Sequence, residues 1–234
     1  MQFRIEDSFW SLFPDVVIGI VVVRGLDNTG DPAMLTAALL ADRARGAVVR
    51  IDDGDITLHP AIAPWRAAYA AFGVKPNKFR SSIESLLRSA RNGNVRSINP
   101  LVDIYNAVSL KYFLPCGGED LARVEGDIRL TRAEGGEHFV PLGSEEEQPP
   151  IAGEVIYRDD VGVICRSWNW REAERTKLTE TTEDVFLCIE ALTELGVGRL
   201  SDACEELASM VKSMLGGEAQ VHILDRVHPR VELS

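Results

Sequence analysis

Arginine and tryptophan side chains gather between residues 165 and 175. If this segment is an extended strand, Arg166, Trp168 and Trp170 share one face, and Asn169 and Arg171 point to the other. An aromatic face beside guanidinium groups could stack an adenine, a contact worth about 1–3 kcal/mol per base. Two tryptophans on one face are also typical of a hydrophobic core, so the sequence leaves both interpretations open. The candidate binding residues of this segment are Arg166, Trp168, Asn169, Trp170, Arg171 and Arg175.

Basic residues are concentrated between positions 75 and 96. This stretch holds six lysines and arginines and one acid, Glu84, whereas the whole chain has a formal net charge of -11. Residues 116–160 hold twelve acids and four bases. A generic nucleic-acid coat is therefore excluded, because phosphate binding depends on lysine and arginine. One local face could still dock a polyanion, with Lys78 and Arg80 as candidate contacts; a solvated helix face is the alternative.

The cysteines carry little sign of metal or nucleophile chemistry. They are Cys116, Cys165, Cys188 and Cys204. There is no CxxC pair and no neighbouring histidine, so we expect no metal and no cofactor. A cysteine nucleophile needs a nearby histidine, and the sequence links none to Cys116 or Cys165. Gly117 and Gly118 follow Cys116 and suit a tight turn whose amides approach a ligand closely. Cys116, Gly117 and Gly118 are therefore candidate binding residues.

Hydrophobic patterning predicts the elements that position these residues. The predicted strands span residues 16–24, 47–51, 55–58, 127–133, 137–142, 154–158, 161–170 and 220–224. The predicted helices span residues 33–45, 59–73, 81–93 and 183–195, with a last helix after Ser201. Asp52, Asp53 and Gly54 form a predicted turn between two short strands.

The helix that begins after Ser81 has the clearest signal. Ser81 and Glu84 form a capping box, and an apolar stripe follows until Gly93. Arg88 and Arg91 fall off that stripe, so we expect them to face outward.

Together the elements predict one α+β domain over residues 1–234, with mixed β-sheets, flanking helices, and the helix and strand of residues 201–225 packed on it. No segment approaches the eighteen or so consecutive apolar residues of a membrane span. The first ten residues carry acids where a signal peptide would be basic and then apolar. We expect a cytoplasmic protein without a membrane partner.

Two runs, RSINPLVDIYNAVSL (96–110) and LPCGGEDL (114–121), resemble the B3/B4 editing module of bacterial phenylalanyl-tRNA synthetase β chains. Arg96 falls on the arginine of the family pattern, and Asp103 and Asn106 fall on its aspartate and asparagine. Pro115 and Asp120 fall on the ends of the family's PLHAFD. The resemblance covers roughly residues 81–191, and the flanking segments look like those of free-standing B3/B4 proteins.

The resemblance implies that the chain binds the aminoacylated end of a tRNA and hydrolyses a mischarged ester with water, without a covalent nucleophile and without synthetase activity. Arg96 and Asn106 would be the catalytic residues. Arginine suits a phosphate of the terminal adenosine, and asparagine can fix a ribose hydroxyl or the water. Asp103 is better explained as a structural tie between helix and sheet, and Asn106 could share that role. The alternative function is non-catalytic binding of tRNA ends, an amino acid or a nucleotide.

The chain also departs from the family pattern. Gly117 stands where PLHAFD has histidine, and Glu119 where it has phenylalanine. The family's pocket glycines correspond to the region of residues 168–170. The family glutamate that meets a tyrosine hydroxyl would fall on Cys188, with Glu190 two positions late. Tyrosine specificity is therefore not carried over, and the sequence specifies neither the tRNA nor the oligomeric state.

Overall fold

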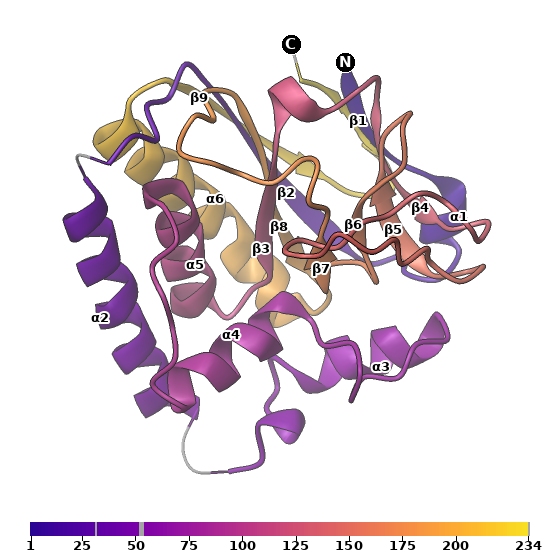
Figure 1. Cartoon of the computed structure of the whole chain (residues 1–234). Coiled ribbons are helices and arrows are strands. Elements are labelled where there is room, and N and C mark those ends of the chain that lie inside the picture. Colours follow the sequence, from indigo (N-terminus) through magenta and orange to yellow (C-terminus); the bar gives the residue numbers. More distant parts are fainter. Residues whose placement is uncertain (31, 52–53, 234) are drawn as a thin grey trace.

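The computed structural model describes residues 1–30, 32–51 and 54–233, which form two β-sheets and the helices around them (Figure 1). The strands are β1 (Gln2–Ile5), β2 (Val17–Arg24), β3 (Cys116–Asp120), β4 (Ile128–Arg132), β5 (Val155–Arg158), β6 (Val163–Arg166), β7 (Arg171–Glu172), β8 (Val185–Ala191), β9 (Glu218–Leu224) and β10 (Arg230–Glu232). The helices are α1 (Asp7–Trp10), α2 (Ala33–Ile51), α3 (Ala63–Ala71), α4 (Ser82–Arg91), α5 (Pro100–Tyr112) and α6 (Glu194–Leu215), with short 3-10 turns at Ile56–Leu58 and Leu121–Arg123. The α+β class predicted from the sequence is confirmed.

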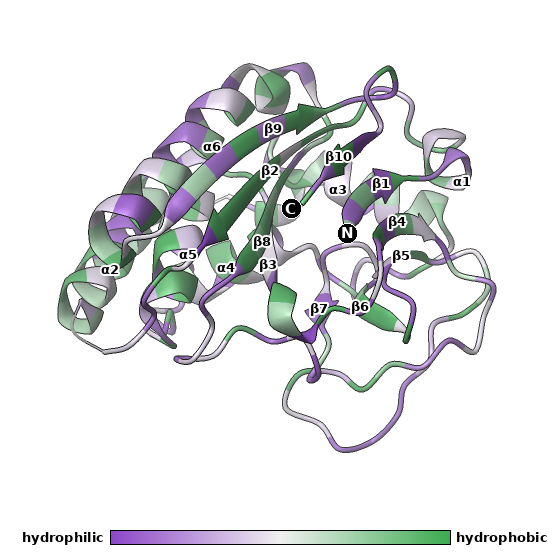
Figure 2. Cartoon of the chain, turned by 90° about the horizontal axis from the view of Figure 1, so that it is seen from above, coloured by the Kyte–Doolittle hydropathy of each residue, from purple (hydrophilic) through white to green (hydrophobic). Residues whose placement is uncertain are grey.

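The four-stranded antiparallel sheet has the order β3-β8-β2-β9. The β-branched run predicted as a strand is β2, and both of its faces are buried. Val21 and Val23 pack with α5 and α6, whereas Ile18, Ile20 and Val22 pack toward the other sheet. Figure 2 shows α2, α5 and α6 on one side of this sheet and the second sheet on the other side.

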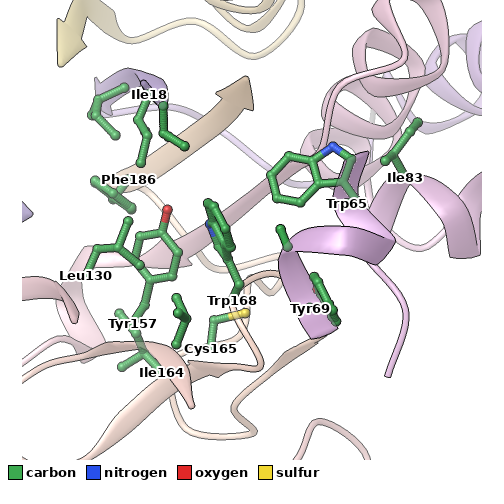
Figure 3. Packing of buried hydrophobic residues seen from close by; sticks show 14 of the residues in the cluster. Ile18, Trp65, Tyr69, Ile83, Leu130, Tyr157, Ile164, Cys165, Trp168 and Phe186 are labelled. Atoms are coloured by element: carbon green, nitrogen blue, oxygen red, sulfur yellow. The ribbon is translucent and has the colours of Figure 1, made fainter. Parts of the chain in front are cut away.

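The second sheet has the order β10-β1-β4-β5-β6-β7 and is mixed, because β1 and β4 are parallel while the other pairs are antiparallel. A cluster of aromatic rings lies beside the space between the sheets. Trp168 is completely buried there, with ring centroids 5.0 Å from Phe9, 4.8 Å from Phe13 and 4.9 Å from Trp65. In Figure 3 its ring lies between Tyr157 and Trp65.

Helix α4 begins as its capping residues predict. The Ser81 hydroxyl accepts a hydrogen bond from the Glu84 amide at 3.4 Å, which satisfies one of the free N–H groups at the helix start. Ile83, Leu87 and Ala90 are buried on one face of the helix. In a full capping box the Glu84 carboxylate would also accept a hydrogen bond from the Ser81 backbone amide. Here it accepts hydrogen bonds from Arg66 and Arg88 instead.

Two predicted strands near position 50 are wrong. Residues 47–51 continue α2 instead, because Leu40, Ala44, Ala47 and Ile51 form one buried helical face. Residues 55–58 contain a 3-10 turn, and the Asp55 carboxylate caps it by accepting a hydrogen bond from the Thr57 amide. Asp52 and Asp53 of the predicted turn lie outside the described residues.

The helix predicted over residues 183–195 is also wrong, since this segment contains β8 and only the start of α6. The segment 137–142 forms a single bridge between Pro141 and Ala173 instead of a strand. Residues 116–118, predicted as a turn, are extended in β3 and pair with β8.

The strand predicted over residues 161–170 ends at Arg166. Ser167 and Trp168 then adopt left-handed backbone conformations, with φ of 47° and 64°, which are uncommon for residues with a β-carbon. The chain reverses here into β7. Trp168 and Trp170 therefore do not share a strand face with Arg166, and the left-handed turn places the Trp168 ring in the core.

None of the helices in the described part of the chain is long and apolar enough to cross a membrane.

Candidate functional site

A small enclosed cavity lies where β3 and β8 of one sheet approach β5, β6 and β7 of the other. Its volume is about 30 Å³. This is room for about two water molecules, at about 10–15 Å³ each by this measure. The lining residues are Ser82, Cys116, Gly117, Gly118, Glu119, Tyr157, Cys165, Trp168, Asn169, Glu172, Phe186, Cys188 and Glu190. Three of them are glutamates and none is a lysine or arginine.

Glu190 of β8 is held by three donors from the second sheet and the turn that follows β6. The Tyr157 hydroxyl and the Trp168 indole N–H donate to its Oε1 at 2.5 and 2.6 Å, and the Asn169 amide donates to Oε2 at 2.5 Å. Burial raises the pKa of Glu190 to about 7, although the three hydrogen bonds oppose this shift. A carboxyl group that titrates near neutral pH is suited to accept a proton from water.

Glu119 and Glu172 form a second acidic group in the same cavity. Burial is the largest cause that raises the pKa of each, and the neighbouring Glu172 raises the pKa of Glu119 further. The two carboxyl groups interact directly, since Glu172 raises the pKa of Glu119 and Glu119 lowers the pKa of Glu172. The Oε2 atoms of both are buried and receive no donor from the described residues.

The two glycines of β3 leave room for these groups. A β-carbon at Gly117 would lie 2.8 Å from Oε1 of Glu172, so the Glu172 carboxyl fills the space of a side chain at this position. This is the position at which the family pattern has histidine. A β-carbon at Gly118 would lie 2.5 Å from a methyl group of Leu187 and 2.7 Å from the carbonyl oxygen of Phe186. Gly118 thus permits the close pairing of β3 with β8.

A wider groove of about 270 Å³ adjoins the cavity, and Gly118 and Glu172 line both spaces. The other lining residues of the groove are Ile98, Asn99, Val102, Tyr105, Leu142, Lys177, Leu178, Thr179 and Glu180. Tyr105 is the aromatic residue of this wall, and its pKa is raised by burial and by nearby Glu172. The groove is the wider and more open of the two spaces, and the cavity behind Glu172 is the narrower.

The cysteine thiols of the cavity are poor nucleophiles. Cys116 and Cys165 are buried, and burial raises the pKa of both far above neutral pH. Their closest charged neighbours are glutamates, which favour the neutral thiol further. Among the described residues, no group of three or more histidines, cysteines, aspartates or glutamates has the arrangement of a metal site.

The predicted site residues are divided between the cavity and the surface. Five of them line the cavity, namely Cys116, Gly117, Gly118, Trp168 and Asn169. The two predicted catalytic residues do not. Arg96 is exposed in the loop before α5, two residues from Ile98 of the groove, and Asn106 is half-buried on α5, four residues after Val102 of the groove.

Asp103 has the structural role that we favoured, with different partners. It is buried and accepts hydrogen bonds from the Ser97 hydroxyl at 2.5 Å and the Ile98 amide at 3.0 Å. It also contacts the Thr36 hydroxyl at 3.4 Å, so it ties the loop before α5 to α2 and not to a sheet.

The arginines near the tryptophans are engaged within the fold. Arg166 is buried and donates two hydrogen bonds to Glu154, at 2.8 and 3.2 Å. Arg175 is paired with buried Asp159 at 2.8 Å. Arg171 is exposed and donates to the Leu142 carbonyl.

Trp170 is partly exposed and packs edge-on against Phe79, with 4.6 Å between ring centroids. Of the two tryptophans, it is therefore the one that a ligand on the surface could reach.

Two arginines of the basic stretch and Arg66, which precedes it, surround the buried carboxylate of Glu84. Arg66, Arg80 and Arg88 lie 3.0, 3.8 and 2.9 Å from Glu84. The cluster keeps an excess of two positive charges, and Arg80 and Arg88 remain 45% and 36% exposed. Arg91 is turned away and donates to the Gly54 carbonyl. Arg80 and Arg88 thus share Glu84 of their own stretch, and among the described residues no ion pair joins them to the acidic segment of residues 116–160.

The carboxyl groups of the cavity were missed in the sequence. Glu119 had one signal, because it stands where the family pattern has phenylalanine. Glu190 lies two positions after the place of the family glutamate, and no sequence pattern pointed to Glu172. The three belong to β3, β7 and β8, and they meet only through the pairing of strands.

Comparison with known proteins identifies the family. The B3/4 domain profile matches residues 64–213, so the chain belongs to the B3/4 domain family. The resemblance seen in residues 96–121 is thereby confirmed.

Several similar proteins are phenylalanine–tRNA ligase β subunits. The one from Nocardia farcinica is 30% identical over 175 residues, which cover 73% of this chain and 20% of that protein. The Pseudomonas putida protein is 30% identical over 141 residues, covering 57% of this chain and 18% of that protein. This chain thus corresponds to about a fifth or less of the length of such relatives. A solved N-terminal fragment of the phenylalanyl-tRNA synthetase β subunit from Pyrococcus horikoshii is similar over 93% of this chain and 49% of that one, with 15% identity and a TM-score of 0.48.

Proposed function

We propose that this chain binds the aminoacylated 3′ end of a tRNA and hydrolyses the ester bond of a mischarged amino acid in trans. The observation that carries the proposal is buried Glu190, which has a pKa of about 7 and lines a cavity with room for about two waters. Membership of the B3/4 family and similarity to synthetase β subunits support tRNA as the partner.

In this mechanism a water molecule occupies the cavity and donates a hydrogen bond to Glu190. Three of the carboxylate's lone pairs are engaged by Tyr157, Trp168 and Asn169, which leaves one on Oε2 for the water. The water oxygen attacks the ester carbonyl carbon as its proton passes to Glu190. The bond from that carbon to the ribose oxygen then breaks, and the proton passes from Glu190 to the ribose oxygen. The products are a free amino acid and an uncharged tRNA.

The groove outside the cavity receives the terminal nucleoside in this proposal. Its volume of about 270 Å³ and its apolar wall of Ile98, Val102 and Tyr105 suit a stacked base. Arg96, in the loop next to Ile98, contacts a phosphate, and Asn106 fixes a ribose hydroxyl. Lys78 and Arg80 extend the contact along the tRNA backbone. In this proposal the chain acts with the translation machinery in the cytoplasm.

The test is hydrolysis of a panel of misacylated tRNAs under single-turnover conditions. We expect the wild-type protein to release one class of amino acid faster than buffer does, and Glu190→Gln to lose about 10²–10⁴-fold of that rate. Glu145→Gln is the matched control, since it removes one carboxyl from an exposed loop. If the wild-type protein binds tRNA ends but releases no amino acid from any tRNA, the deacylase proposal is wrong and the non-catalytic alternative is correct.

A further inference from the structure

We infer that the Glu119–Glu172 pair binds the free α-ammonium group of the aminoacyl ester. The inference deepens the proposed function and rests on it, because it names the substrate group that the cavity recognises besides the ester. It restricts the substrates to aminoacyl-tRNAs with an unmodified amino group.

Hydrogen-bond donors are scarce around the pair. Oε2 of Glu119 and Oε2 of Glu172 are buried and have no hydrogen-bond partner among the described residues. The nearby donors are the Thr176 hydroxyl, which lowers the pKa of Glu119, and the Cys165 thiol, which lowers the pKa of Glu172. Glu119 is only 3% exposed. A buried carboxyl oxygen without a donor is unfavourable, so a ligand that brings N–H groups gains free energy at this position.

The charge of the pair favours a cation. Both groups are acids, and no lysine or arginine lines the cavity with them. Arg175, whose charge lowers the pKa of Glu119, is itself paired with Asp159. An ammonium group is a cation with three hydrogen-bond donors, and it therefore suits this acidic wall.

The size and position of the cavity fit the same group. The cavity of about 30 Å³ admits two groups of the size of water, which fits one attacking water at Glu190 and one ammonium group at the pair. Glu172 lines both the cavity and the groove, so a ligand can place its ammonium group on Glu172 while its nucleoside stays outside.

This site discriminates against N-acylated substrates. A formylated or peptidyl ester has a neutral amide in place of the ammonium group, and it carries a bulky substituent that the cavity excludes. Binding such a substrate would leave the buried Oε2 atoms of Glu119 and Glu172 without the donors of an ammonium group. Sites built for a polar group reject analogues that lack it more strongly than apolar pockets reject a change of shape.

The first experiment measures binding without hydrolysis. The probe is alaninamide, which has the ammonium group but no ester, and the matched ligand is N-acetylalaninamide. Binding is followed by calorimetry and by the NMR signal of the Trp168 indole N–H, which borders the cavity through Glu190. We expect alaninamide to bind at least tenfold more tightly than its acetylated form, a difference of about 1.4 kcal/mol. Equal affinities, or no binding of alaninamide at millimolar concentrations, would overturn the inference.

The second experiment uses charge-neutralising variants. Glu119→Gln and Glu172→Gln keep the shape of the pair, and each should bind alaninamide at least tenfold more weakly, while Glu145→Gln should bind like the wild type. Melting curves check that each variant folds. Variants that fold and keep wild-type affinity would contradict the assignment, and the comparison of the two ligands on the wild-type protein decides the case if a variant does not fold.

A third experiment separates this inference from the proposed function. An aminoacyl-tRNA that the protein hydrolyses is prepared a second time with its amino group acetylated, and its hydrolysis is measured again. Loss of hydrolysis supports the ammonium site. Hydrolysis at an unchanged rate overturns the site and leaves the deacylase proposal intact. If the chain hydrolyses no aminoacyl-tRNA at all, the proposed function fails, and the alaninamide comparison still decides whether the pair binds an ammonium group.

Discussion

Substitution of Glu190 by glutamine tests both the fold and the proposed chemistry. The carboxyl has a pKa of 4.5 in an unfolded chain and about 7 in the folded protein, because burial disfavours its charged form. Each pKa unit corresponds to about 1.36 kcal/mol, so ionised Glu190 costs the folded state about 3 kcal/mol. Below pH 4.5 both states hold the proton and the contribution of Glu190 to stability is complete. As the pH rises from 4.5 to about 7, only the unfolded chain releases it, and stability falls.

Glutamine at this position cannot titrate, so the variant does not lose this stability as the pH rises. Its amide N–H₂ faces the amide of Asn169, which costs about 1–3 kcal/mol at every pH. We therefore expect the free energy of unfolding of the wild type, minus that of Glu190→Gln, to decrease by about 3 kcal/mol between about pH 4.5 and pH 8. Urea denaturation at a series of pH values measures this difference, and effects of the overall net charge cancel in it.

The measurement reports Glu190 alone only if its titratable neighbours do not change their protonation over the same pH range. The titratable groups that face it are Tyr69, Tyr157, Cys116, Cys165, Cys188 and Glu172. Burial raises the pKa of the tyrosines and thiols above their usual values, so they stay neutral over this range. The variant Glu172→Gln shows how much of the pH dependence of stability comes from the titration of Glu172.

The deacylation rate, divided by the rate in buffer, should rise through about pH 7 in the wild type and be flat in Glu190→Gln. A stability difference that is the same at both ends of the pH series would refute the reasoning.

Three further outcomes are expected. Gly118→Ala should destabilise the protein by about 1–3 kcal/mol in urea denaturation, because its β-carbon meets β8, whereas Gly46→Ala, in open space within α2, should stabilise it by about 0.5–1 kcal/mol. Cys116→Ala and Cys165→Ala should keep most single-turnover activity, since neither thiol is the nucleophile; a stably folded but inactive variant would disprove attack by water. Arg96→Ala should lower the slope of log Kd for tRNA against log salt by about 0.7–0.9 for each phosphate that the variant no longer neutralises, and an unchanged slope would show that Arg96 binds no phosphate.

The sequence predicted those elements whose signals are local. The β-branched run of β2 lies between two neighbouring strands and is buried on both faces, so its composition reflects its environment directly. The side-chain cap at Ser81 needs only four residues of sequence, 81–84. The α+β class and the B3/4 family followed from such local patterns, the family from residues 96–121.

The errors arose where tertiary packing overrides local preference. Residues 47–51 contain two valines and an isoleucine, yet they extend α2, because Ala47 and Ile51 continue a buried helical face. Strand β8 was mistaken for a helix because burial on both faces removes the alternation that marks a half-buried strand. The same cause hid the cavity, since Glu190 is a buried acid within an apolar strand and its donors come from the other sheet.

The pairing of β1 with β10 places Gln2 opposite Glu232, so the polypeptide leaves this fold beside the point at which it enters. A short linker between these two strands would close the backbone into a ring, and new ends could be opened in the exposed loop around residues 145–147. The same closure lets such a module be inserted into a longer polypeptide at one point of its surface, with both connections side by side. In the synthetase β subunits, the matching segment is a minor part of a much longer chain. A fold in which β1 and β10 are paired can therefore be joined to another polypeptide at one place while its cavity remains intact.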